Sequence, residues 1–139
     1  MAEKKEAIRR LLEGVWDDPG VVDEVVTDGY VGHDPALPEP IRGRQGVKDN
    51  FQMYKDAFAG ARITVDEVIS EGDRAAARWT GRGRHQAELM GIGPTGRDVT
   101  VSGISFFRFE DGKIAESWDN WDALGMMAQL GALPAPAQA

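Results

Sequence analysis

The spacing of hydrophobic residues divides the chain into a helical first half and a strand-rich second half. Over residues 3–16 the apolar side chains recur every three or four positions, which predicts an amphipathic helix with one buried face. The same period predicts a short second helix at 19–27 and a third helix at 44–58. Between them, 29–35 has the pattern of a short strand leaving a turn, and three prolines make 35–43 a loop.

From residue 61 onward, alternating apolar and β-branched residues predict antiparallel strands. The predicted strands and a last short helix cover 61–69, 74–85, 99–109, 113–121 and 122–130. Helices followed by strands predict an α+β fold, in which three N-terminal helices pack on one face of a strongly curved antiparallel sheet. Such a sheet closes into a cone, and the pocket inside the cone is the expected ligand site.

Composition and charge restrict the class of protein. The 139 residues suffice for one domain, predicted at 1–132, and residues 133–139 are expected to form a disordered tail. The net charge of -7 argues against a nucleic-acid partner, because phosphate binding requires clustered positive charge. The absence of cysteine excludes disulfides and thiolate metal sites, and no apolar run reaches membrane-spanning length. Without a signal-peptide pattern, the expected location is the cytoplasm.

The last two predicted strands meet at Glu110-Asp111-Gly112, and the turn there sets which residues face the pocket. A three-residue loop would pair Phe109 with Lys113 and Gly103 with Asp119. A two-residue turn is the alternative, which would shift the pairing by one and mix the two faces. The favoured three-residue loop places these residues on the pocket face: Ser105, Phe107, Asp119 and Trp121.

The opposite face of the same hairpin is apolar at Ile104, Phe106, Ile114 and Trp118, although a sheet covered by helices on one face is usually polar on the other. Exposed apolar area of this kind usually marks an interface. A two-fold homodimer with sheets packed back to back is therefore predicted. A loop that covers this surface is the alternative.

Several short motifs occur in the order of a known family. They are Val31-Gly32-His33-Asp34-Pro35, Glu71-Gly72-Asp73-Arg74, Gly83-Arg84-His85, Gly91-Ile92-Gly93-Pro94-Thr95-Gly96, Leu130-Gly131 and the hairpin from Phe107 to Asp119. With these motifs the chain resembles, over about residues 8–131, the SnoaL-like polyketide cyclases of the NTF2-like superfamily of α+β cones. That superfamily also contains isomerases, hydrolases and non-catalytic ligand binders.

The resemblance implies a cyclase that works without a metal or an organic cofactor on a hydrophobic small molecule. In these cyclases an aspartate on the last strand abstracts a proton next to a carbonyl, and the enolate closes a ring by aldol attack. The matching residue here is Asp119. The histidine that is often found on the preceding strand is replaced by Ser105, which removes a possible hydrogen-bonding partner of the acid/base group.

Aromatic residues are expected to surround Asp119. Trp79 and Trp121 are predicted to form apolar walls that raise the pKa of its carboxyl by desolvation, as a general acid/base near neutral pH requires. Trp16 and Phe51 are the helix residues predicted to reach the cavity. The alternative for Asp119 is a buried carboxyl that is bonded to serine or backbone groups.

His33 and His85 are the only histidines, and each could donate a hydrogen bond to a substrate carbonyl or instead tie a loop to backbone carbonyls. Two histidines without a fixed spacing do not predict a metal site. The predicted function is a cofactor-independent aldol cyclase acting on a hydrophobic carbonyl compound, with Asp119 as base and then acid. The alternatives are a non-catalytic hydrophobic binder, or a hydrolase or isomerase on the same fold. Hydrolysis would require an Asp–Arg–Asp set, and Arg108 falls on the face opposite to Asp119.

Overall fold

In a computed structural model that describes residues 2–132, the helices and strands follow one another in the order that the hydrophobic pattern predicts, except that a two-residue strand, Ile41–Arg42, lies within the predicted loop at 35–43. The helices are α1 (Ala2–Gly14), α2 (Val21–Val25), α3 (Gly43–Ala57) and α4 (Ala123–Gln129). The strands are β1 (Val26–His33), β2 (Ile41–Arg42), β3 (Phe58–Glu71), β4 (Arg74–His85), β5 (Asp98–Glu110) and β6 (Lys113–Trp121). The predicted tail at 133–139 lies outside the described residues.

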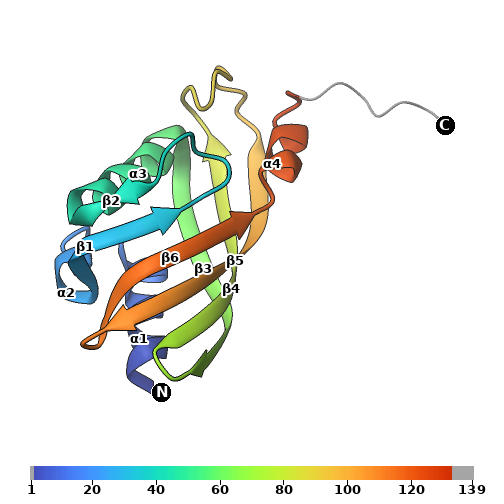
Figure 1. Ribbon diagram of the computed structural model, residues 1–139. Coiled ribbons are helices and arrows are strands. Elements are labelled where there is room, and N and C mark those ends of the chain that lie inside the picture. The colour runs from blue at the N-terminus through green and yellow to red at the C-terminus, as the bar shows by residue number, and fades with distance from the viewer. Residues whose placement is uncertain (1, 133–139) are drawn as a thin grey trace.

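All six strands form one curved sheet in the order β2-β1-β6-β5-β4-β3 (Figure 1). Helices α1 and α3 both pack against β3, and α3 also packs against β1, so the prediction of an α+β fold is confirmed. The sheet is mixed, because β1 runs parallel to β6 and pairs His33 with Trp118. The predicted second helix is shorter than expected, since Val26 already pairs with Ile114 of β6. None of the helices within residues 2–132 is long and apolar enough to cross a membrane.

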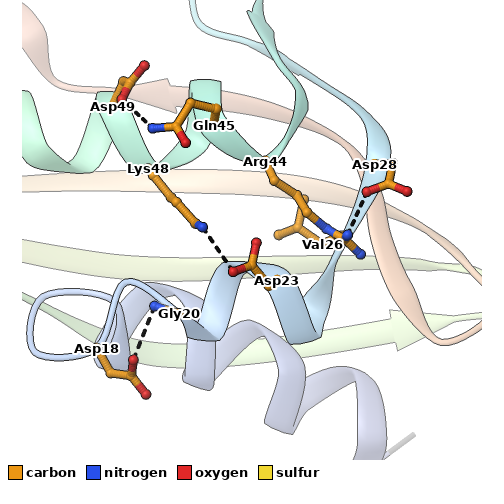
Figure 2. Close-up of polar contacts among 9 residues, drawn as sticks. All are labelled: Asp18, Gly20, Asp23, Val26, Asp28, Arg44, Gln45, Lys48 and Asp49. Carbon is orange, nitrogen blue, oxygen red and sulfur yellow. Dashed lines mark hydrogen bonds and ion pairs between the residues drawn. The ribbon is translucent and has the colours of Figure 1, made fainter.

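Polar contacts at the N-terminal end of α3 hold this helix against α2 and β1 (Figure 2). The Arg44 side chain donates from Nε to the carbonyl oxygen of Val26 at 2.8 Å, and Lys48 forms an ion pair with Asp23 at 2.9 Å. Ion pairs at the surface contribute little energy individually. Their effect is on orientation, because α3 is held with Val47 buried and its apolar face toward the sheet.

The turn between β5 and β6 differs from the prediction. It has two residues, Asp111 and Gly112, with φ angles of 50° and 78°, and it pairs Glu110 with Lys113. Two consecutive positive φ values define the type I′ hairpin turn, which Asp-Gly favours because its twist matches that of the strands. The predicted three-residue loop is therefore wrong.

A β-bulge immediately after this turn compensates for the missing loop residue. Phe109 pairs with Ile114, whereas the next residue back, Arg108, pairs with Glu116, so Ala115 is the extra residue of β6. Ile114 and Ala115 are both buried although they are adjacent in a strand. Beyond the bulge, the side chains of β6 again alternate between the two faces of the sheet, and odd-numbered residues such as Ser117 point inward.

The bulge keeps the predicted inner face while changing every predicted pair. Phe107 pairs with Ser117, Ser105 with Asp119, and Gly103 with Trp121. The predicted pairing of Gly103 with Asp119 is thus wrong by two residues. A shift of two leaves the face of each side chain unchanged, since side chains alternate with a period of two.

The outer face of the sheet carries a continuous row of mutually paired residues across five strands. The row consists of Ile69, Ala76, Phe106, Trp118 and His33. Ile104 and Phe106 are exposed, as predicted, with 56% and 42% of their surface accessible. The prediction that Ile114 lies on this face is wrong, because the bulge turns its side chain into the core, where it is fully buried.

Candidate functional site

A cavity lies between α1, α3 and the sheet, and aromatic side chains make up much of its wall. Those that line it are Trp16, Tyr30, Phe51, Tyr54, Phe58, Trp79, Phe107 and Trp121. The polar groups that accompany them include two carboxylates, Asp34 and Asp119, and two serines, Ser105 and Ser117. The structure therefore brings to one cavity all of the predicted wall residues from the helices and strands, together with Asp119.

A chain of hydroxyl groups ends on the carboxylate of Asp119. Ser117 donates from Oγ to Oδ2 of Asp119 at 3.1 Å, and a short hydrogen bond links the Ser117 hydroxyl to the buried hydroxyl of Tyr30. When Ser117 donates its proton to Asp119, it must accept the proton of Tyr30. The Ser117 hydroxyl that donates to Asp119 is thus itself oriented by its hydrogen bond with Tyr30.

A second hydroxyl reaches Asp119 from the neighbouring strand. Ser105 lies directly opposite Asp119 in the sheet, and its hydroxyl lowers the pKa of the Asp119 carboxyl. The indole Nε1 of Trp79 donates to Ser105 Oγ at 3.0 Å, which leaves the serine proton free for the carboxylate. A Cβ atom added to Gly103 would lie 2.4 Å from Cζ2 of Trp79, so only glycine leaves room for this indole. Ser105 therefore places a hydroxyl opposite Asp119, at the position where the resemblance implies a histidine.

The environment of Asp119 favours its protonated form. Burial is the largest cause and raises the pKa of the Asp119 carboxyl, and the negative charge of Asp34 raises the pKa further. The hydrogen bonds from Ser105 and Ser117 act in the opposite direction but do not cancel the effect of burial. A carboxyl with a raised pKa on a cavity wall can accept a proton and return it near neutral pH.

Asp34 is a second carboxylate on the cavity wall, and the sequence pattern did not predict this position for it. Its two oxygens accept from Nε1 of Trp121 at 3.2 and 3.1 Å, and Oδ1 also accepts from the backbone N–H of Ala36 at 2.8 Å. These contacts fix the carboxylate on the wall next to the end of β1. Its position directly after His33, in a strand-ending motif, is the signal that could have revealed it.

The two histidines lie outside the cavity, contrary to the role predicted for them. Tyr30 faces inward on β1, so His33 projects from the outer face, where Nε2 contacts Glu116 Oε2 at 2.8 Å and the ring stacks on Trp118. His85 is fully buried and accepts from the backbone N–H of Thr95 at 3.2 Å. This contact holds the loop through a backbone N–H and not through a carbonyl, which the alternative interpretation expected, and Nε2 of His85 has no hydrogen-bond partner among residues 2–132.

Arg108, the arginine considered for a hydrolytic site, does not face the cavity. Arg108 lies on the outer face and forms ion pairs with Glu110 at 2.8 Å and Glu116 at 3.1 Å, as its predicted position requires. An Asp–Arg–Asp set built on Arg108 is therefore excluded by its orientation. Within residues 2–132, no cluster of three or more His, Asp or Glu side chains could hold a metal ion.

Comparison with known proteins identifies a consistent set of relatives. A family profile described as SnoaL-like polyketide cyclase matches residues 6–130. The chain is 31% identical over 136 residues to the aklanonic acid methyl ester cyclase AcmA of Streptomyces galilaeus, covering 94% of this chain and 92% of that protein. Among solved structures, TsrD from Streptomyces laurentii superposes with a TM-score of 0.86 and 32% identity, covering 96% of this chain and 98% of TsrD. Wild-type IdmH from Streptomyces antibioticus superposes with a TM-score of 0.79 and 30% identity, and the match covers 92% of this chain and 98% of IdmH.

Proposed function

Because this chain belongs to the SnoaL-like polyketide cyclase family, we propose that it closes a ring in a hydrophobic, carbonyl-bearing small molecule by an intramolecular aldol reaction. The observation that carries the proposal is the Asp119 carboxyl, which lies on the wall of an aromatic cavity with its pKa raised by burial. A base in such an environment is suited to removing a proton from carbon next to a carbonyl.

The reaction needs one group that takes a proton and later returns it. Asp119 would take a proton from the carbon next to one carbonyl, and the electrons of the broken C–H bond would form an enolate. The enolate carbon would then attack the carbon of a second carbonyl, forming the new C–C bond and an alkoxide. The alkoxide would recover the proton from Asp119. No atom or electron is gained or lost, so the step requires no cofactor.

The two serines have a defined part in this cycle. Ser105 and Ser117 hold the ionised carboxylate in one orientation, because each hydroxyl has its own fixed partner, Trp79 or Tyr30. Positioned hydrogen bonds of this kind limit the reorganisation that proton transfer would otherwise require. The replacement of histidine by Ser105 is therefore compatible with acid/base chemistry at Asp119.

Exchange of carbon-bound hydrogen for deuterium tests the proposal without knowledge of the natural substrate. The probe is β-tetralone in deuterium oxide, and proton NMR follows loss of the signal next to its carbonyl. The parent protein should accelerate the exchange, and Asp119→Asn should lose the acceleration by roughly 10²–10⁴-fold, which is the usual contribution of positioned acid–base catalysis. The amide has nearly the shape of the carboxyl but cannot take the proton.

Asp122→Asn is the matched control. Asp122 is an exposed carboxylate three residues along the chain that caps α4 by accepting from the N–H of Gly125 at 2.8 Å, and asparagine caps equally well. This variant should exchange at the parent rate. Equal exchange in the parent and Asp119→Asn would refute the role of Asp119. Probe binding without acceleration in the parent would favour a non-catalytic hydrophobic binder.

The outer row of the sheet supports a further part of the proposal, a dimer of two identical chains. Phe106 and Ile104 are exposed beside Trp118 on this face, and the row extends to Ile69 on the edge strand β3. Apolar side chains that continue across four neighbouring strands, from Ile69 to Trp118, are unusual on the exposed side of a sheet. A second copy of the chain would cover it by two-fold packing of the same row against itself.

A further inference from the structure

We propose that the hydroxyl of Tyr54 binds the oxygen of a substrate carbonyl, the one that becomes an alkoxide when the ring closes. This inference rests on the proposed aldol reaction and names a group that it leaves unassigned. Asp119 accounts for the proton on carbon, but a reaction that places negative charge on oxygen also benefits from a fixed donor near that oxygen.

Tyr54 is a buried donor without an acceptor in the described part of the chain. It lines the cavity from α3, and its ring packs edge-on against Trp121, with centroids 6.1 Å apart and an interplanar angle of 89°. The hydroxyl oxygen is covered, yet it has no hydrogen-bond partner among residues 2–132. Leaving a buried hydroxyl unpaired is costly, and native proteins rarely do so without reason. An oxygen of a molecule that enters the cavity would provide the missing acceptor.

The other aromatic donors of the cavity wall are already used by the protein. Trp16 donates to the Leu12 carbonyl oxygen, Trp79 to Ser105 and Trp121 to Asp34, while Tyr30 is bonded to Ser117. Tyr54 is the exception among these five side chains. The difference is specific, because Tyr30 is also a buried tyrosine of the same cavity, and its hydroxyl does have a protein partner.

Electrostatics keep Tyr54 in its neutral, donating form. Burial is the largest cause that raises the pKa of the Tyr54 hydroxyl, and the charges of Asp34 and Asp119 raise the pKa further. The Tyr54 ring packs against Trp121, which lies two residues along β6 from Asp119 and on the same face of the strand. A ligand oxygen held by Tyr54 would therefore lie in the same cavity as the carboxyl of Asp119. Ligands with a ketone, quinone or ester oxygen fit this donor, since each presents an acceptor on an apolar frame.

A pair of tricyclic probes tests the assignment by binding alone. Fluorenone and fluorene have nearly the same shape, but only fluorenone has a carbonyl oxygen. Quenching of the fluorescence of the cavity tryptophans gives the dissociation constant of each probe. Tyr54→Phe should weaken fluorenone binding about three- to tenfold, the usual effect of losing one hydrogen bond, and leave fluorene binding unchanged. Equal changes for the two probes, or no change for fluorenone, would overturn the proposal.

Thermal unfolding of the same variant provides a second criterion. Tyr54→Phe removes a hydroxyl that has no partner, so its midpoint temperature should equal or exceed that of the parent. Tyr30→Phe is the matched control, because it removes a bonded hydroxyl and should unfold at a lower temperature. A comparable decrease for Tyr54→Phe would show that Tyr54 is bonded within the protein, which also overturns the inference. Neither readout depends on turnover, so failure of the exchange test at Asp119 and failure at Tyr54 are separate results.

Discussion

Replacing Asp119 by asparagine should change how the stability of the protein depends on pH. In the unfolded chain this carboxyl titrates near its ordinary pKa of about 3.9. In the folded protein the pKa is raised, chiefly by burial. Between the two values the folded state therefore holds one proton that the unfolded state has lost. The stabilising contribution is complete below the unfolded pKa and is lost as pH rises through the folded pKa.

The size of the effect follows from the number of protons. A difference of one bound proton lowers the free energy of unfolding by about 1.4 kcal/mol for each pH unit within this window. Asparagine does not titrate, so the curve of Asp119→Asn lacks this slope. Stability measured relative to the variant should thus decrease from pH 4 upward and become constant above the folded pKa. Asp34→Asn should move the upper limit of the window to lower pH, because the Asp34 charge helps to raise the pKa of Asp119.

Urea unfolding at a series of pH values, followed by tryptophan fluorescence, measures this difference. Titrating groups that do not interact with Asp119 contribute equally to the parent and the variant, so the difference between the two curves reports Asp119 and the groups coupled to it, of which Asp34 is one. Parallel curves would show that the pKa of Asp119 is the same in the folded and unfolded states. A difference of opposite sign would mean that the hydrogen bonds from Ser105 and Ser117 outweigh burial. Either result would remove the main argument for Asp119 as a base near neutral pH.

Two further predictions concern the wall of the cavity and the outer face. Gly103→Ala should lower the free energy of unfolding, measured with urea, by roughly 1–3 kcal/mol, because the new methyl group would overlap the ring of Trp79. Gly93→Ala is the control and should have little effect, because nothing lies within 4 Å of the added methyl group. Phe106→Glu should shift the mass measured by light scattering from twice the chain mass to the chain mass, because a charge would be buried in the proposed dimer. A parent protein that is already monomeric would contradict the dimer.

Alternation along β6 was sufficient to predict that Asp119 faces the cavity, but the pairing could not be predicted. The turn at Asp111 and Gly112 and the bulge at Ala115 each shift the register, and their effects on the face cancel. A pattern of period two cannot detect two compensating shifts. Ile114 was misplaced for the same reason, since it lies between the turn and the extra residue.

The sequence predicts which side chains within the strands line the cavity, but not the placement of the residues at the strand ends. His33 lies at the end of β1, and its orientation depends on parallel pairing with β6, which local pattern does not reveal. Asp34, the next residue, faces the cavity because Trp121 holds its carboxylate. The helical spacing of 44–58 predicts an apolar face on the third helix, but the lack of a partner for the Tyr54 hydroxyl is visible only when the surrounding side chains are placed.

The bulge at Ala115 decides which face of the sheet the rest of β6 presents. With the same turn and the same chain length but no bulge, Asp119 would lie opposite Ile104 and would face away from the cavity. A chain without Ala115 would need no bulge, because Asp119 would then lie opposite Ser105 in unbroken pairing. A one-residue deletion at this point therefore preserves the site, whereas a substitution that removed the bulge at unchanged length would turn Asp119 out of the cavity.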